Sequence, residues 1–468
     1  MKNLRTKCLA LALAFVISLL PYPVNAQTGT VGFSTTITYQ NIGTTVAHVT
    51  LLFYPEGQSS PISIARPDLP VGASATVAVG SLGTTGGFRG SAVVKSDVQL
   101  AVAMTQIPSV STARSRPMAT GFIQGSSEIW FLYTYKGNVS TILSVQNLDN
   151  KSANLTLEFL GSGTPITITK TNVGAGNAAF FDLSKVSEIP AGFSGTVHVK
   201  SIRTGTTTVG KIAGTQVNLT ADGNGVYAND SFSQIGKKVY MPVALCMALG
   251  GMSTSYYVYN TDATQSTTAT ITYNTGKKGT LTLAPNKGGW YNACLPSGTV
   301  AGYSGHAVVT SSVTDILVLG HAKDAGMSAT FQGQSVGSNN LAVPYANYST
   351  NSYTNGQKQR TTIYVMNLGA NLASGTVKVK YFDKTGKLVG THSLPAIANG
   401  TKVESAANKI GSAGAEFGYY SDGTSGGSAM IEGPAGSNLM AAVWAMSNPV
   451  KGTLVGEMYN AIPILLAP

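Results

Sequence analysis

A short motif with period-two alternation returns four times along the chain. In each copy a threonine, two apolar residues and an asparagine occupy alternate positions. The copies are Thr35-Ile37-Tyr39-Asn41, Thr141-Leu143-Val145-Asn147, Thr254-Tyr256-Val258-Asn260 and Thr361-Ile363-Val365-Asn367. This alternation predicts a strand with one buried face, and an asparagine side chain can bond the backbone of a turn. We therefore expect four equivalent strands, each ending at its asparagine.

Further alternating segments follow each asparagine at similar distances. A second segment ends in an aromatic residue and precedes a glycine-containing turn, as in Val49-Leu51-Phe53 and Tyr54–Gly57. Later come a glycine, an aromatic residue and another strand pattern, as in Gly87–Val94 and Gly192–Val199, and most copies then have a closing apolar segment. The asparagines are 106, 113 and 107 residues apart. About seven short strands in each such unit are typical of an immunoglobulin-like β-sandwich.

These patterns predict an all-β protein of four tandem immunoglobulin-like β-sandwich domains arranged as a rod. The expected boundaries are 1–26 for a signal peptide, 27–122, 128–234, 237–336 and 340–450 for repeats 1 to 4, and 455–468 for a C-terminal strand.

The chain resembles secreted bacterial proteins built from tandem immunoglobulin-like repeats. The resemblance rests on the threonine-to-asparagine strands and on copies such as Gly87-Phe88-Arg89-Gly90-Ser91-Ala92-Val93-Val94, and it covers roughly Gly32 to Asn448. It implies a surface, matrix or adhesive structure.

The N-terminus has the pattern of a secretory signal. Lys2, Arg5 and Lys7 precede an apolar stretch from Leu9 to Leu20, and Val24-Asn25-Ala26 offers a small-residue cleavage site. The alternative is a transmembrane anchor, but the stretch is too short for one. We expect the mature chain to begin at Gln27, to be secreted or held at the cell surface, and to contain no transmembrane segment.

The two ends of the repeat array are unequal. Repeats 2 to 4 each open with an extra apolar strand, at 129–133, 239–245 and 341–345, whereas the few residues between Gln27 and Phe33 are too short to supply one for repeat 1. The tail has an additional apolar segment, Ile462-Pro463-Ile464-Leu465-Leu466, whose apolar-proline-apolar core matches Met241-Pro242-Val243.

This inequality predicts that the tail of one subunit adds a strand to the open sheet edge of repeat 1 in the next subunit. Such a contact is heterologous and generates a filament if it does not close. Two alternatives remain: the tail folds back on its own repeat 4, or it closes on repeat 1 of the same molecule, which a rod disfavours.

Composition argues against an enzyme. Only 10% of the residues are charged, against about 25% in an average soluble protein. The 19 acidic residues and five histidines show no catalytic, cofactor-binding or metal-ligand spacing.

Removal of the signal takes away three of the 30 basic residues and leaves a net charge of +8. Because the basic residues are scattered, we expect no nucleic-acid site, although a surface polysaccharide is a conceivable partner.

Two cysteines follow the signal, and both fall in repeat 3. In an oxidising compartment Cys246 and Cys294 are candidates for a disulfide; the alternative is two buried free thiols.

The sequence thus predicts a secreted structural protein that forms a homopolymer by donation of its C-terminal strand. The alternative is a monomeric adhesin or carbohydrate-binding repeat array. An enzyme ranks far below both.

Overall fold

The computed structural model describes residues 12–15, 32–58, 60–82, 88–109, 113–161, 163–220, 225–295, 299–324, 326–349, 357–407, 410, 418, 426–449 and 455–464. Within these ranges the chain forms antiparallel β-sheets and a 3-10 turn at Val79–Ser81, with no α-helix. The all-β prediction is therefore confirmed.

Each repeat contains two sets of four antiparallel strands, which we call the first and second sheet. In repeat 2 the pairing of Ser140 with Lys136 joins the two sets into one eight-stranded sheet, and in repeat 4 each set gains a fifth strand. The first sheet contains, repeat by repeat and in spatial order, β1 (Ala12–Phe15), β6 (Gly90–Ser96), β3 (Val49–Pro55) and β4 (Ile62–Ala65); β9 (Glu128–Lys136), β14 (Phe193–Arg203), β11 (Ala153–Leu160) and β12 (Ile166–Val173); β17 (Lys238–Cys246), β22 (Tyr303–Ser311), β19 (Thr267–Tyr273) and β20 (Lys278–Leu283); β25 (Asn340–Val343), β31 (Gly427–Glu432), β28 (Lys378–Asp383) and β29 (Leu388–Ser393).

The second sheet contains, in the same way, β5 (Ser74–Ala78), β2 (Phe33–Asn41), β7 (Leu100–Pro108) and β8 (Met118–Thr120); β13 (Ala178–Asp182), β10 (Val139–Asn147), β15 (Ile212–Thr220) and β16 (Val226–Asp230); β21 (Gly288–Asn292), β18 (Ser253–Asn260), β23 (Ile316–Lys323) and β24 (Ser328–Gln332); β30 (Lys402–Ala406), β27 (Gln357–Asn367), β32 (Leu439–Pro449) and β33 (Val455–Asn460). Two short strands, β26 (Tyr348–Ser349) and β34 (Ile462–Pro463), complete repeat 4. The strand order supports tandem β-sandwiches, while the immunoglobulin-like type stays a prediction.

The four threonine-to-asparagine strands, β2, β10, β18 and β27, end at their asparagines as predicted. Asn147 is fully buried, and its amide donates to the carbonyls of Lys151 and Val173, 2.8 Å away in each case. Its side-chain oxygen accepts a hydrogen bond from the backbone N–H of Asp149 at 2.9 Å. Asn41 forms the same three bonds in repeat 1. The repeated asparagine therefore anchors the turn that leaves each strand.

The opening strands predicted for repeats 2 to 4 are β9, β17 and β25, which pair with β14, β22 and β31. In repeat 1 the equivalent place beside β6 is taken by β1, whose residues Ala12–Phe15 lie inside the predicted signal peptide. Among the described residues, no segment after the predicted cleavage site takes that place.

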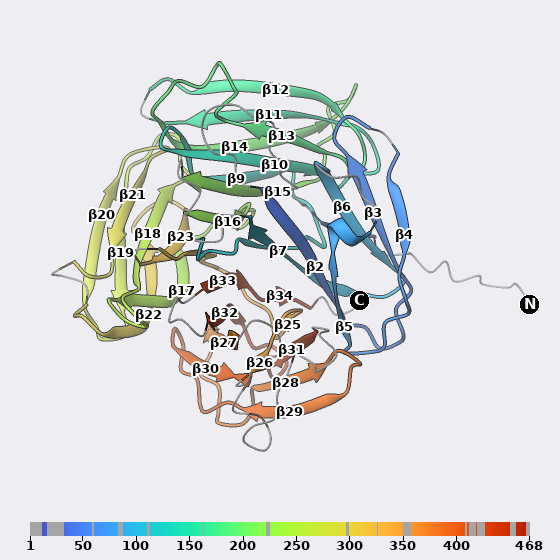
Figure 1. The fold of residues 1–468 in the computed structure, drawn as a ribbon. Coiled ribbons are helices and arrows are strands. Elements are labelled where there is room, and N and C mark those ends of the chain that lie inside the picture. Colours follow the sequence, from blue (N-terminus) through green and yellow to red (C-terminus); the bar gives the residue numbers. More distant parts are fainter. Residues whose placement is uncertain are drawn as a thin grey trace, which may run out of the picture.

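An equivalent hydrogen bond joins repeat 1 to repeat 2 and repeat 4 to repeat 1. The Ser91 hydroxyl of repeat 1 donates to the Gly176 carbonyl of repeat 2 at 2.8 Å. At the equivalent position of repeat 4, the Ser428 hydroxyl donates to the Gly72 carbonyl of repeat 1 at 3.1 Å. Repeat 4 is thus followed by repeat 1, and the four sandwiches form a closed ring (Figure 1).

The predicted rod is therefore wrong. A bidentate ion pair between Arg114 and Asp324, with nitrogen–oxygen distances of 3.2 and 2.9 Å, joins repeats 1 and 3, which a rod would hold apart. The physical reason is that the junctions turn the chain in one direction. Residue patterns determine the strands but carry little information about the angle between successive sandwiches.

The C-terminal tail closes the ring within one molecule. Ile462 and Pro463 pair with Ala342 and Leu341 of β25 in the same repeat. Ile462, which is only 5% exposed, packs against Ile42 and Ala101 of repeat 1. The two alternatives to strand donation are therefore both seen in this structure, because the tail folds back on repeat 4 and also contacts repeat 1 of the same molecule.

Candidate functional site: a polar pocket at the ring centre

The last strand of each second sheet runs along the centre of the ring. These strands, β8, β16, β24 and β33, contact one another in a closed order: β8 with β16, β16 with β24, β24 with β33, and β33 with β8. They end at Thr120, Asp230, Gln332 and Asn460, which occupy equivalent positions of the four repeats. Four polar side chains are therefore brought together from points more than a hundred residues apart in sequence.

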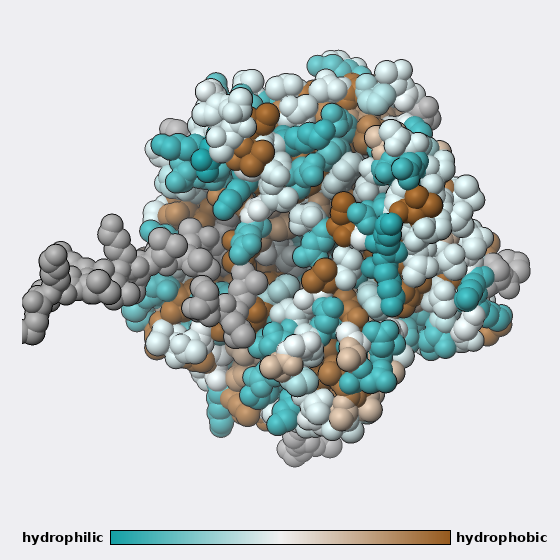
Figure 2. Space-filling view, turned by 180° about the vertical axis from the view of Figure 1, so that it is seen from behind, coloured by the Kyte–Doolittle hydropathy of each residue, from teal (hydrophilic) through white to brown (hydrophobic). Residues whose placement is uncertain are grey.

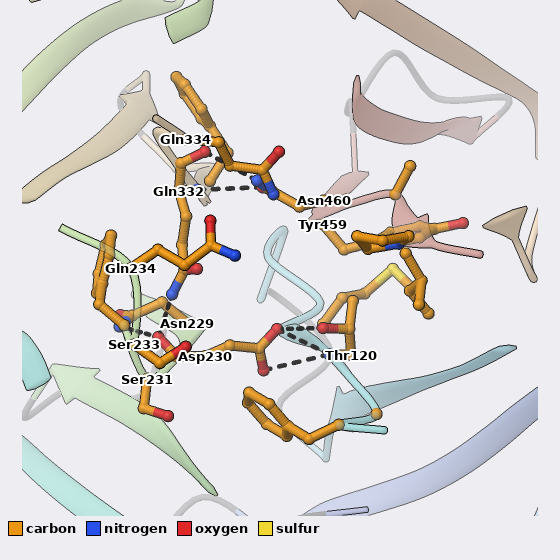
Figure 3. A pocket seen from close by; sticks show the side chains of 18 of the residues that line it. Thr120, Asn229, Asp230, Ser231, Ser233, Gln234, Gln332, Gln334, Tyr459 and Asn460 are labelled. Carbon is orange, nitrogen blue, oxygen red and sulfur yellow. Dashed lines mark hydrogen bonds between the residues drawn. The ribbon is translucent and has the colours of Figure 1, made fainter. Parts of the chain in front are cut away.

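A pocket of about 440 Å³ opens where these strands end. All four repeats line it, through residues 118, 120–126, 228–234, 330–334 and 458–463. Its volume lies within the range of about 300–1,000 Å³ that is usual for small-molecule sites. Figure 3 shows Asn229, Gln234, Gln332, Gln334 and Asn460 around this space.

Hydrogen bonds between neighbouring repeats fix the pocket wall. The Asp230 carboxylate accepts from the Thr120 hydroxyl at 2.6 Å and from the Thr120 backbone N–H at 3.0 Å. The Asn460 amide donates to the Gln332 carbonyl at 2.8 Å, and its side-chain oxygen accepts from the Gln332 N–H at 3.1 Å. The Gln332 amide in turn donates to the Asp230 backbone carbonyl. These bonds link repeats 1, 2, 3 and 4 in series and hold the wall residues in place.

Within the ranges that the structure describes, Asp230 is the only charged residue that lines the pocket. Loss of hydration on burial raises the pKa of its carboxyl group from 3.8 to about 7, although the two hydrogen bonds from Thr120 act in the opposite direction. The group therefore changes protonation state near neutral pH.

Two further side chains are available for a ligand. Asn229 is 4% exposed and lines the pocket, and its side-chain oxygen has no hydrogen-bond partner in the described part of the chain. Buried polar atoms are usually paired, so this oxygen is a candidate acceptor for a bound molecule. Gln234 is exposed on the pocket wall, and Figure 3 shows its amide projecting into the space near Gln332 and Asp230.

Sequence reasoning did not identify this pocket. The residues belong to four separate short strands, and only ring closure brings them together. The one available signal was a polar residue in the equivalent place after each closing strand, which is too weak to detect without the fold.

The structure also places the residues singled out from the sequence. Cys246 and Cys294 are joined in a disulfide, with 5.0 Å between their Cα atoms. Cys246 ends β17 of the first sheet and Cys294 follows β21 of the second, so the bond links the two sheets of repeat 3.

In the tail, Ile464 packs beside Ile462 at the contact between repeats 4 and 1. Leu465 and Leu466 lie outside the described residues.

Neither a metal cluster nor a membrane-spanning helix is found in the ranges described above. No group of three or more histidine, cysteine, aspartate or glutamate residues there could hold a metal ion. No helix in that part of the chain is long and apolar enough to cross a membrane.

Comparisons with known proteins give little guidance. No protein-family model matches the chain, and no curated protein matches it. A solved structure described as "Crystal structure of tetra-tandem repeat in extending region of large adhesion protein" aligns over 91% of this chain and 95% of its own. The two are 12% identical, with a TM-score of 0.09. At that score the alignment supports no conclusion about fold or function, and the function must be inferred from the pocket itself.

Proposed function

We propose that this protein is a secreted, non-enzymatic protein of the cell surface that works by binding, and that its ring presents the central pocket to a ligand. The observation that carries the proposal is that all four repeats contribute polar side chains to one pocket. The N-terminal signal pattern supports secretion, and the low content of charged residues supports a role without catalysis.

The surface of the ring fits this proposal. Figure 2 shows apolar residues scattered among polar ones on the face seen there, rather than gathered in one broad patch. Large apolar patches mark stable protein interfaces. The pocket, with its buried and oriented polar groups, is therefore a better candidate for the binding site than that face.

A binding assay on the native surface tests the proposal. Labelled mature protein should bind cells of the source organism saturably, and Gln234→Ala should weaken this binding at least tenfold. Gln58→Ala changes an exposed glutamine in a turn of repeat 1 and serves as the matched control. The proposal fails if the protein is not exported, or if both variants bind as the unchanged protein does.

A second candidate function is head-to-tail assembly into a filament or matrix. It is favoured by the pairing of β6 with β1, because removal of a signal peptide that includes Ala12–Phe15 would leave the outer edge of β6 without that strand. An unpaired edge is a template for strand addition. The tail residues 462–466 are the donor in this proposal, and they would have to leave β25 of their own chain, as in domain swapping.

Electron microscopy of the mature protein tests this second candidate. Filaments that disappear on deletion of residues 462–468 would support strand donation. Single rings at all protein concentrations, or filaments that persist without the tail, would contradict it.

A further inference from the structure

We propose that the ligand of the central pocket is a neutral, hydroxyl-rich molecule of monosaccharide or disaccharide size, bound by Asp230, Asn229 and Gln234. This inference rests on the proposed function and names the chemical class of the ligand. It follows from the charge, the hydrogen-bonding groups and the apolar surfaces of the pocket.

The charge of the lining excludes anionic ligands as a class. None of the described lining residues is lysine, arginine or histidine, and among them Asp230 contributes the only carboxyl group. A phosphate or carboxylate would lack a cationic partner and would meet a group that becomes negative near neutral pH. A cation would find one carboxylate and no second negative group in the described part of the lining.

The hydrogen-bonding groups match hydroxyl groups, which both donate and accept. Asn229 offers an unpaired acceptor oxygen at 4% residue exposure. The side-chain amide of Gln234 offers both a hydrogen-bond acceptor oxygen and a hydrogen-bond donor NH₂ group. The Asp230 carboxylate has acceptor capacity beyond its bonds to Thr120, because a carboxylate provides about four acceptor sites. These groups lie on the walls of one cavity of about 440 Å³.

Apolar rings complete the lining. Phe122, Phe232 and Tyr459 belong to three different repeats, and each borders the pocket. A sugar ring carries hydroxyl groups on its rim and C–H groups on its faces. The combination of amide, carboxyl and aromatic groups therefore suits such a ring better than it suits a purely polar or a purely apolar molecule.

The test uses the purified, mature full-length protein and ligand-observed NMR with two sets of probes. The first set consists of glucose, galactose, mannose, N-acetylglucosamine and their common disaccharides. The second set consists of glucuronate, inorganic phosphate and spermidine. We expect at least one neutral saccharide to bind, and all members of the second set to fail.

Substitutions of pocket residues test whether the saccharide binds in the pocket. Gln234→Ala and Asp230→Asn should each weaken saccharide binding at least tenfold, whereas Gln58→Ala should leave it unchanged. Gln234 is exposed, so its variant is expected to fold even if Asp230→Asn does not. Equal saccharide binding by Gln234→Ala and the unchanged protein would overturn the inference.

The outcomes separate the ligand class from the proposed function. Pocket-dependent binding of spermidine, phosphate or glucuronate in place of saccharides would overturn the ligand class and leave the binding function standing. Pocket-dependent binding to cells without binding of any saccharide would likewise overturn the ligand class and leave the binding function standing. If neither set of probes nor the cell surface is bound, both the ligand class and the proposed function are wrong.

Discussion

At the scale of single residues, the repeated asparagine has the clearest role. Its side chain replaces three hydrogen bonds that the turn backbone would otherwise make with water, and it does so while fully buried in the second sheet. This role could be predicted from the sequence, because the residue recurs at the end of the same alternating pattern. The role of Asp230 could not, because its partner Thr120 belongs to another repeat, 110 residues earlier.

Replacement of Asn147 by alanine is expected to destabilise repeat 2 by about 2–4 kcal/mol, because buried backbone groups lose their partners. Chemical denaturation, followed by hydrogen exchange in repeat 2, measures the change. Asn150→Ala, at an exposed position in the following turn, should change the free energy of unfolding by less than about 0.5 kcal/mol. Equal effects of the two substitutions would contradict the anchoring role.

Asp230 is expected to make stability depend on pH. Its pKa is about 7 in the folded chain against an ordinary value of 3.8, so between these values the folded state binds more protons than the unfolded state. The free energy of unfolding should therefore fall as pH rises from about 4 to 7. Asp230 is only half-buried by surface area, so we expect a contribution of about 1–2 kcal/mol.

The pH dependence is measured by thermal unfolding of the unchanged protein and of Asp230→Asn across this range. The variant should show a flatter profile, and the two proteins should differ most above pH 7. Asp68→Asn, at an exposed position of repeat 1, is the control and should keep the slope of the unchanged protein. Parallel profiles for all three proteins would show that Asp230 does not titrate in this range.

At the scale of strands, the sequence predicted the long alternating elements and missed the short central ones. β10 and β27 are long, and each buries alternate apolar residues such as Leu143 and Val145 or Ile363 and Val365. β8 has only three residues, too few to show a period. The tail shows a related limit of the sequence pattern: its apolar-proline-apolar residues match an opening strand, and in this structure Ile462–Pro463 pairs beside β25 of the same chain.

The disulfide is expected to matter at this scale, because it joins the opening strand of repeat 3 to the opposite sheet. Mass spectrometry of the unreduced mature protein should show Cys246 bonded to Cys294, and two free thiols would contradict the bond. The double substitution of both cysteines by serine should lower the stability of repeat 3 by about 2–4 kcal/mol. Repeat 2, which contains no cysteine, provides the internal comparison by hydrogen exchange.

At the scale of the whole molecule, ring closure depends on contacts between the two ends of the repeat array. Ile462 lies between β25 and the Ile42–Ala101 surface of repeat 1, and Ser428 bonds Gly72 nearby. The sequence could not show that these contacts form within one chain. The same surfaces could meet within a molecule or between molecules, and only the angle of each junction decides between a ring and a filament.

Ile462→Asp is expected to weaken this closure, because a buried carboxylate without a partner is costly. Small-angle X-ray scattering should then show a larger radius of gyration, while the circular dichroism of the sheets persists. Ile62→Asp, on the exposed strand β4, should leave the radius unchanged. A compact Ile462→Asp variant would indicate that the remaining contacts between repeats 4 and 1 close the ring without the tail.

Closure also constrains how such a chain can change over evolutionary time. A linear array tolerates the loss or duplication of a repeat, because each unit contacts only its neighbours. Here the Ser91–Gly176 junction recurs as Ser428–Gly72 and completes one circuit. An added or deleted unit would leave that last junction unable to meet its partner and would separate the four strands that enclose the pocket. We therefore expect genetic variation to preserve the copy number at four while the exposed loops diverge.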